Sequence, residues 1–126
     1  MSHLFAVAAG GALGALGRYA IISQLGHRLG GDFPAGTIVV NVLGSFILGL
    51  IAALTLGAWS PPPELHLFLT AGLLGALTTF STFALDVAYL SGHRAFAQAA
   101  IYVLASVLLS VGGFFAGLSL LRAVLA

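Results

Sequence analysis

The sequence predicts an all-α membrane protein with four transmembrane helices, and three observations support this fold class. Of the 126 residues, 60% are hydrophobic and only 6% are charged, whereas soluble domains carry about 25% charged residues. The mean hydropathy is +1.15. Four segments reach the roughly 20 mostly apolar residues that cross a bilayer. They use nearly the whole chain, so we expect one transmembrane domain, residues 1–126, without a soluble domain.

The expected spans are separated by short breaks. The spans are residues 3–25, 34–58, 64–90 and 96–124. The break "HRLGGDFP" holds two glycines, a charge of each sign and a proline, and "WSPPPE" holds three prolines, which cannot continue a helix. The third break, "SGHR", is typical of a tight polar turn. The first segment has no basic n-region and no clear cleavage site, so we expect a span rather than a signal peptide.

Composition and spacing argue against several function classes. The chain has no cysteine, which removes disulfides and thiol chemistry, and its net charge of +1 does not indicate nucleic-acid binding. No histidine has the spacing to another histidine or a carboxylate that is typical of a metal site. The spans also lack a nucleophile–base pair and a carboxylate pair, so an enzyme is not expected.

The arginines do not decide the orientation of the chain in the membrane. Four spans place both termini and the second break on one side, which carries Arg122. The opposite side carries Arg28 and Arg94, with Arg18 near the end of the first span, and the chain has no lysine. Because lysine and arginine set orientation, this bias is weak. The chain could insert in a single orientation, or in both orientations and pair as an antiparallel dimer. Four helices of this length do not easily enclose a pathway alone, so we expect an oligomer.

Polar side chains recur at intervals of four residues in two spans. They are Thr37, Asn41 and Ser45 in the second span and Tyr102, Ser106 and Ser110 in the fourth. Each set lies on one helix face, and polar side chains in a bilayer face protein or water. A single Ser or Thr is usually ordinary interhelical hydrogen bonding. Two stripes, one containing an amide with two donors, instead indicate a polar lining.

Two pairs of glycines recur at the same interval of four residues, and helix packing explains them. The pairs are Gly10 with Gly14 and Gly113 with Gly117. Such small-xxx-small pairs let helices approach closely, so we interpret them as packing positions.

The stretch "GLLGALTTFSTF", residues 72–83, interleaves hydroxyls with Phe80 and Phe83. Gly75 and the following hydroxyls make a weak helix, because the hydroxyls compete for backbone hydrogen bonds. A break here would release carbonyls, which a hard cation such as Na⁺ would bind. Ring edges are the positive side of an aromatic, so the two phenylalanines would suit a small anion. Donors from Asn41, Ser106 or Ser110 would complete its shell without a fixed positive charge, which would hold the ion too tightly to conduct.

Three motifs resemble the signatures of the Fluc, or CrcB-type, fluoride channels. They are "GGALGALGRY" (residues 10–19), "GTIVVNVLGSFILG" (36–49) and "GLLGALTTFSTF" (72–83). The motifs occur in order, and the resemblance covers all four spans. It implies a dual-topology, antiparallel homodimer of four-helix subunits. From the residues themselves we expect the third helix to be broken near Gly75, and the high alanine, glycine and leucine content fits a bacterial inner membrane. Such channels conduct fluoride passively through two antiparallel pores and expel fluoride that entered as the weak acid HF.

The resemblance also implies residue roles. Arg18 would lie near the aqueous vestibule, and the backbone carbonyls of Gly75 and Thr78 would hold a structural Na⁺ at the dimer interface. Asp86 receives no role. The fluoride pathway would be lined by Asn41, Phe80, Ser81, Thr82, Phe83, Tyr102, Ser106 and Ser110.

Two other classes compete with a fluoride channel. A dual-topology exporter similar to the small multidrug transporters also has four short spans, but its mechanism needs a carboxylate embedded in the membrane. The first span here has none, and Asp86 lies late in the third. A non-transporting scaffold would explain the glycine pairs, but not two polar stripes with Asn41.

Overall fold

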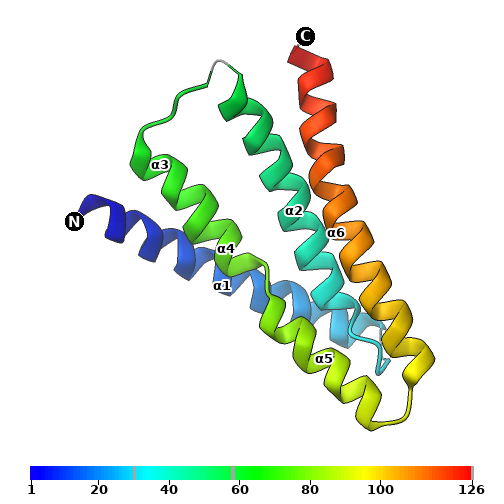
Figure 1. Ribbon diagram of the computed structural model, residues 1–126. Helices are drawn as coiled ribbons and strands as arrows, with labels where there is room; N and C mark the ends of the chain where they lie inside the picture. The colour runs from blue at the N-terminus through cyan, green and yellow to red at the C-terminus, as the bar shows by residue number, and fades with distance from the viewer. Residues whose placement is uncertain (30, 58, 126) are drawn as a thin grey trace.

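The computed structural model describes residues 1–29, 31–57 and 59–125, and every regular element in these ranges is a helix (Figure 1). Its elements are α1 (Ser2–Leu29), α2 (Ala35–Leu56), α3 (Pro63–Leu67), the π-helix η1 (Phe68–Leu74), α4 (Gly75–Leu77), α5 (Phe80–Gly92) and α6 (Phe96–Leu125). Four stretches are long and apolar enough to cross a membrane, with α3, η1, α4 and α5 together forming the third. The prediction of an all-α protein with four candidate spans is confirmed.

The helix ends differ slightly from the expected spans. α1 continues past Leu25 to Leu29, so His27 and Arg28 of the expected break are helical. Basic side chains are favourable in the last turn of a helix, where they face its negative end, and neither residue breaks a helix. Gly30 in the first expected break and Ala58 at the end of the second expected span lie outside the described residues.

The helices pack as two pairs, and the pairs contact each other near the middle of the third span. In Figure 1, α2 runs beside α6, while α1 runs beside the first half of the third span. The termini and the connection before α3 lie toward one end of the subunit, and the connection from α5 to α6 lies at the other. This arrangement brings α2, α6 and the middle of the third span together.

Glycines set the closeness of both pairs. A Cβ at Gly10 or Gly14 would collide with backbone of η1, and a Cβ at Gly117 would collide with the carbonyl of Phe46 on α2. Gly49 of α2 meets the carbonyl of Phe114 on α6 in the same way. Because these contacts join backbone to backbone, no side-chain rotation would relieve a larger residue. The interpretation of the glycine pairs as packing positions is confirmed.

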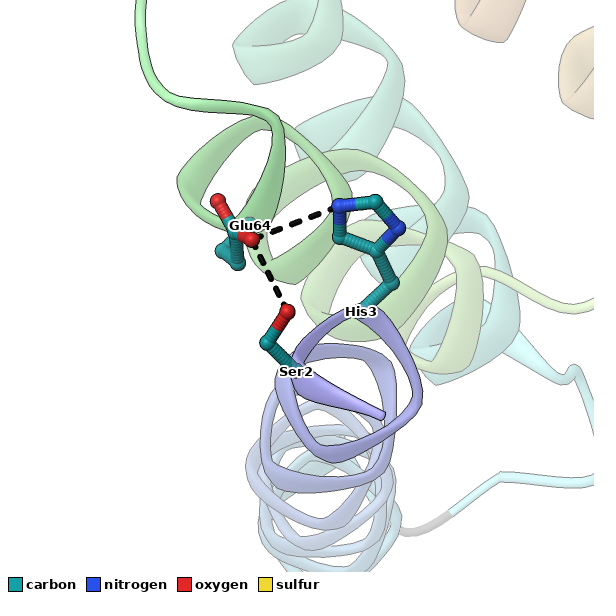
Figure 2. A network of polar contacts seen from close by, with 3 residues as sticks. All are labelled: Ser2, His3 and Glu64. Atoms are coloured by element: carbon teal, nitrogen blue, oxygen red, sulfur yellow. Dashed lines mark hydrogen bonds and ion pairs between the residues drawn. The ribbon is translucent and has the colours of Figure 1, made fainter.

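The third span is also tied to the N-terminus at its outer end. Figure 2 shows Glu64 in the first turn of α3, where its Oε1 accepts a hydrogen bond of 2.9 Å from the Ser2 hydroxyl. The Nε2 atom of His3 lies 3.3 Å from the same oxygen and forms an ion pair with it when protonated. All three groups are solvent-accessible, so the cluster aligns two helix ends and adds little stability.

The turn between α5 and α6 is tight, as the sequence predicted. The N–H of Arg94 donates to the Ser91 carbonyl and the N–H of Ala95 donates to the Leu90 carbonyl, each at 3.0 Å. This pattern is a Schellman motif, which places one residue in the left-handed conformation. That residue is Arg94, with φ of 58°.

Close helix contact predicts a large difference between two glycines of α6. Gly117→Ala should lower the free energy of unfolding by about 1–3 kcal/mol, because the added methyl meets the α2 backbone. Gly112→Ala is the matched control, since a Cβ there meets nothing within 4 Å. Reversible unfolding in mixed micelles measures both. Equal effects from the two substitutions would contradict this account of the α2–α6 contact.

Candidate functional site

Regular helix geometry is interrupted between α4 and α5. Thr78 and Thr79 have extended backbone angles, with φ and ψ of −81° and 156° and of −154° and 118°. The N–H of Thr78 still donates to the Leu74 carbonyl at 3.0 Å. The N–H of Thr79 would donate to the Gly75 carbonyl in a continuous α-helix, but it donates to the Oδ1 atom of Asn41 at 2.7 Å. The Gly75 carbonyl therefore lacks its usual helical donor.

Asn41 of α2 satisfies both polar backbone groups of Thr79. Besides accepting from the N–H, its amide donates from Nδ2 to the Thr79 carbonyl at 3.0 Å. Buried backbone groups without partners are costly in a bilayer, so a protein side chain must replace the lost helical bonds. Gly44, almost one helix turn beyond Asn41, lets α2 come this close, because a Cβ there would collide with the Thr78 side chain.

Thr79 also organises the start of α5. As the N-cap, its Oγ1 accepts a hydrogen bond of 3.1 Å from the N–H of Thr82. The same hydroxyl donates to the Thr82 hydroxyl at 3.0 Å and lies 3.2 Å from that of Ser81. Sequence reasoning identified the hydroxyl cluster but not this cap. The signal was available, since a threonine that precedes a new helical segment is a favoured N-cap residue.

A cavity of about 470 Å³ lies beside this interruption, between α2, the third span and α6. It brings together five of the side chains that the sequence assigned to the fluoride pathway. No lining residue is ionisable. The lining consists of Asn41, Gly44, Ser45, Leu48, Thr70, Leu74, Gly75, Thr78, Thr79, Phe80, Phe83, Ser106, Val107, Ser110 and Val111.

Two hydroxyls in this cavity have no protein partner. The Oγ atoms of Ser106 and Ser110 are buried and make no hydrogen bond within the described residues. They lie one helix turn apart on α6 and both line the cavity. An unsatisfied buried hydroxyl costs about 1–3 kcal/mol. The pair is therefore available to bind an occupant of the cavity.

Aromatic rings connect the cavity to the outer surface of the subunit. The centroids of Phe80 and Phe83 are 5.3 Å apart, and Phe83 stacks on Tyr102 at 5.5 Å. Phe80 is 79% exposed, whereas Tyr102 is fully buried and donates its hydroxyl to Asp86 at 2.7 Å. The row of rings thus runs from the surface of the subunit to a buried tyrosine. The hydrogen bond from Tyr102 also gives a partner to Asp86, to which the sequence assigned no role.

Four of the expected site residues lie next to the cavity without lining it. Ser81 and Thr82 belong to the hydroxyl cluster around Thr79, and Tyr102 lies behind Phe83. The Nη1 atom of Arg18 lies 3.5 Å from the Thr78 carbonyl, at the outer limit for a hydrogen bond.

The molecule is thus a protein with four candidate membrane spans and an uncharged, partly polar cavity beside the interruption in its third span. Residues 5–118 match the family described as "CrcB-like protein, Camphor Resistance (CrcB)". The match covers most of the chain. The protein therefore belongs to the CrcB-like family, and the resemblance inferred from the three motifs is confirmed.

Similar proteins cover essentially the same length. A protein of Rhodospirillum centenum is 54% identical over 126 residues, covering 100% of both chains. Proteins of Nitrobacter winogradskyi and Rhizobium meliloti are 46% and 44% identical over 123 residues, covering 98% of each chain. All three carry the name "Fluoride-specific ion channel FluC".

The cap at Thr79 predicts a local loss of stability. Thr79→Val keeps the side-chain shape but removes the hydroxyl that accepts from the Thr82 N–H, so it should cost about 0.5–2 kcal/mol. Thr55→Val is the control, because the Thr55 hydroxyl bonds only carbonyls of its own helix and should matter much less. Unfolding in mixed micelles compares the two. A larger loss at Thr55 would rule out the cap as a stabilising contact.

Proposed function

We propose that this protein is a fluoride-selective ion channel that exports fluoride passively across the bacterial inner membrane and so confers fluoride resistance. Family membership, the names of its relatives and four candidate spans support this function. The relatives' names favour a channel over a small multidrug exporter. The uncharged cavity points the same way, because its lining has no carboxylate for proton exchange.

The observation that carries the proposal is the lining of the cavity. Fluoride is small and strongly hydrated, so a pore must replace the hydrogen-bond donors of water. Ser106 and Ser110 supply hydroxyls without other partners, and Phe80 and Phe83 supply ring edges, which are the positive side of an aromatic. A fixed positive charge in the lining would hold the anion too firmly for rapid exit.

The remaining expected residues extend this pathway. Ser81 and Thr82 add hydroxyls beside the phenylalanines, and Tyr102 continues the row of rings inward. Arg18 lies close to the cavity but does not line it, which suits a role at the vestibule.

The pathway predicts slow conduction when ring edges are removed. Phe80→Ile and Phe83→Ile should each slow fluoride efflux from vesicles at least about tenfold, which corresponds to 1.4 kcal/mol on the barrier. Phe114→Ile and Phe115→Ile are matched controls. These rings contact each other on α6 and do not line the cavity, so the change should be much smaller.

Parallel assays test the function as a whole. Vesicles that release fluoride but neither chloride nor a lipophilic cation indicate a fluoride channel. Proton-coupled uptake of the lipophilic cation would instead support the exporter. Wild-type fluoride flux in folded Phe80→Ile and Phe83→Ile proteins would mean that the ion does not pass these rings.

The proposed channel is an antiparallel homodimer with two pores. Phe80, at 79% exposure, leaves one end of the aromatic row at the surface of a single subunit. A second subunit facing the other way would cover this end, and the weak arginine bias allows both orientations. A C-terminal tag should therefore be accessible from both sides of the membrane. Labelling from one side alone in intact cells would contradict dual topology.

A structural Na⁺ between the subunits belongs to the same proposal. The carbonyls of Gly75 and Thr78 would hold it, since hard cations take oxygen ligands and two subunits would supply twice as many. The described geometry fits this role in one respect, because the Thr79 N–H turns to Asn41 and leaves the Gly75 carbonyl without its helical donor. The nearby Arg18 guanidinium would have to share the Thr78 carbonyl with the ion. When bound, the ion would supply a positive charge that attracts the Gly75 and Thr78 carbonyls of both subunits.

Replacing Na⁺ tests the cation directly. Exchange of sodium for the bulky N-methylglucamine cation should lower the thermal midpoint of the purified dimer, because the larger cation cannot enter a site built from carbonyls. An identical midpoint in both salts, at equal ionic strength, would argue against a bound sodium ion.

A further inference from the structure

Asn41 makes more hydrogen bonds to the protein backbone than a side chain that only lines an ion pathway needs. Its amide pairs with both backbone groups of a single residue, at 2.7 Å and 3.0 Å. Thr79 can present both groups because it is extended, and the N–H and C=O of an extended residue point to the same side. Asn41 therefore takes the place that a neighbouring strand has in a β-sheet.

This pairing uses most of the hydrogen-bonding capacity of the amide. Oδ1 accepts the Thr79 N–H, and one hydrogen of Nδ2 goes to the Thr79 carbonyl. A primary amide has two donor hydrogens, so a single N–H remains for the cavity. The serines of α6 have hydroxyls without any other partner and are better placed to serve an anion.

Thr79 in turn fixes the start of α5. It directly precedes Phe80, and its hydroxyl caps the N–H of Thr82. Phe80 and Phe83 are the first and fourth residues of α5, so a shift of Thr79 moves both rings. We infer that Asn41 is a positioning residue: by holding the N–H and C=O of Thr79 it fixes the helix interruption and thereby aims the two phenylalanines into the cavity. The flux tests of this inference rest on the proposed fluoride channel.

The inference sets a specific chemical requirement at position 41. The side chain must offer one acceptor and one donor, side by side, at the reach of asparagine. A protonated aspartic acid meets this requirement because its carboxyl has one O–H and one acceptor oxygen. An ionised aspartate has acceptors only and repels the Thr79 carbonyl, and serine is too short to bridge both groups.

Few charged groups surround this position. The cavity lining contains no ionisable side chain. Among the described residues beside it, the Arg18 guanidinium lies 3.5 Å from the Thr78 carbonyl, and Asp86 accepts the Tyr102 hydroxyl next to Phe83. A pH dependence that appears in Asn41→Asp and not in the wild type would therefore come from the introduced carboxyl.

The experiment compares Asn41→Asp, Asn41→Ser and the wild type at acidic and alkaline pH. One readout is fluoride efflux from vesicles, with protein-free vesicles subtracted because HF crosses lipid at acidic pH. The other is amide hydrogen exchange of the peptide covering residues 78–83, which does not depend on conduction. Ser45→Asp is the matched control, because it places a carboxyl in the same cavity one helix turn from Asn41 but outside the pairing.

Asn41→Ser should slow efflux at least about tenfold and accelerate exchange of the 78–83 peptide at both pH values. Asn41→Asp should match the wild type in both readouts at acidic pH and lose efflux at least about tenfold at alkaline pH, where the buried carboxyl ionises. Ser45→Asp should leave the exchange of this peptide unchanged at both. If Asn41→Ser yields no folded protein, Asn41→Asp prepared at acidic pH still tests the requirement.

Three results would overturn the inference. Wild-type efflux in folded Asn41→Ser would show that the pairing is dispensable. Slow efflux with unchanged exchange would show that Asn41 acts on the ion directly. Slow efflux of Asn41→Asp at acidic pH would show that the second N–H is required. Absence of fluoride efflux from wild-type vesicles would refute the proposed function instead, and the exchange measurements would still test the pairing.

Discussion

Backbone hydrogen bonding without water is the constraint on which the rest of this structure depends. A helix that crosses a bilayer satisfies its own N–H and C=O groups, and any departure needs a substitute partner at the same depth. Here the departure is two residues long, and one amide from a neighbouring helix supplies partners for both backbone groups of Thr79. The cap of α5 and the placement of Phe80 and Phe83 depend on where Thr79 is held, because Thr79 is the N-cap of that helix.

Close contact between helix backbones allows Asn41 to make these hydrogen bonds to Thr79. An asparagine side chain is short, so it reaches a backbone on another helix only where the two helices nearly touch. Gly44 allows that approach next to the interruption, and Gly49 and Gly117 hold α2 against α6 on the other side. The buried apolar core is small, and many more large apolar side chains are exposed than are fully buried. Tight glycine contacts therefore contribute precision that a large hydrophobic core provides in soluble proteins.

The four spans could be predicted because length and hydropathy are properties of single segments. The polar stripes and glycine pairs were also visible, since helical periodicity shows which residues share a face. The sequence could not show which backbone group each polar side chain meets, because that depends on the offset between helices. Asn41 was expected to line the fluoride pathway, and in the structure it lines the cavity while its amide also pairs with the Thr79 backbone. Asp86 had no assigned partner until the packing of α5 on α6 brought Tyr102 to it.

The turn between α5 and α6 has a consequence for the biogenesis of the protein. Arg94 occupies a left-handed conformation, with φ of 58°, in which a residue other than glycine is strained by roughly 1–2 kcal/mol. The chain has only four basic side chains that are always charged, and such charges govern which way a nascent membrane protein threads into the lipid. At this turn the folded structure favours a glycine, whereas membrane insertion favours a basic residue. A glycine would relax the turn but remove one of the few charges that the insertion machinery can read.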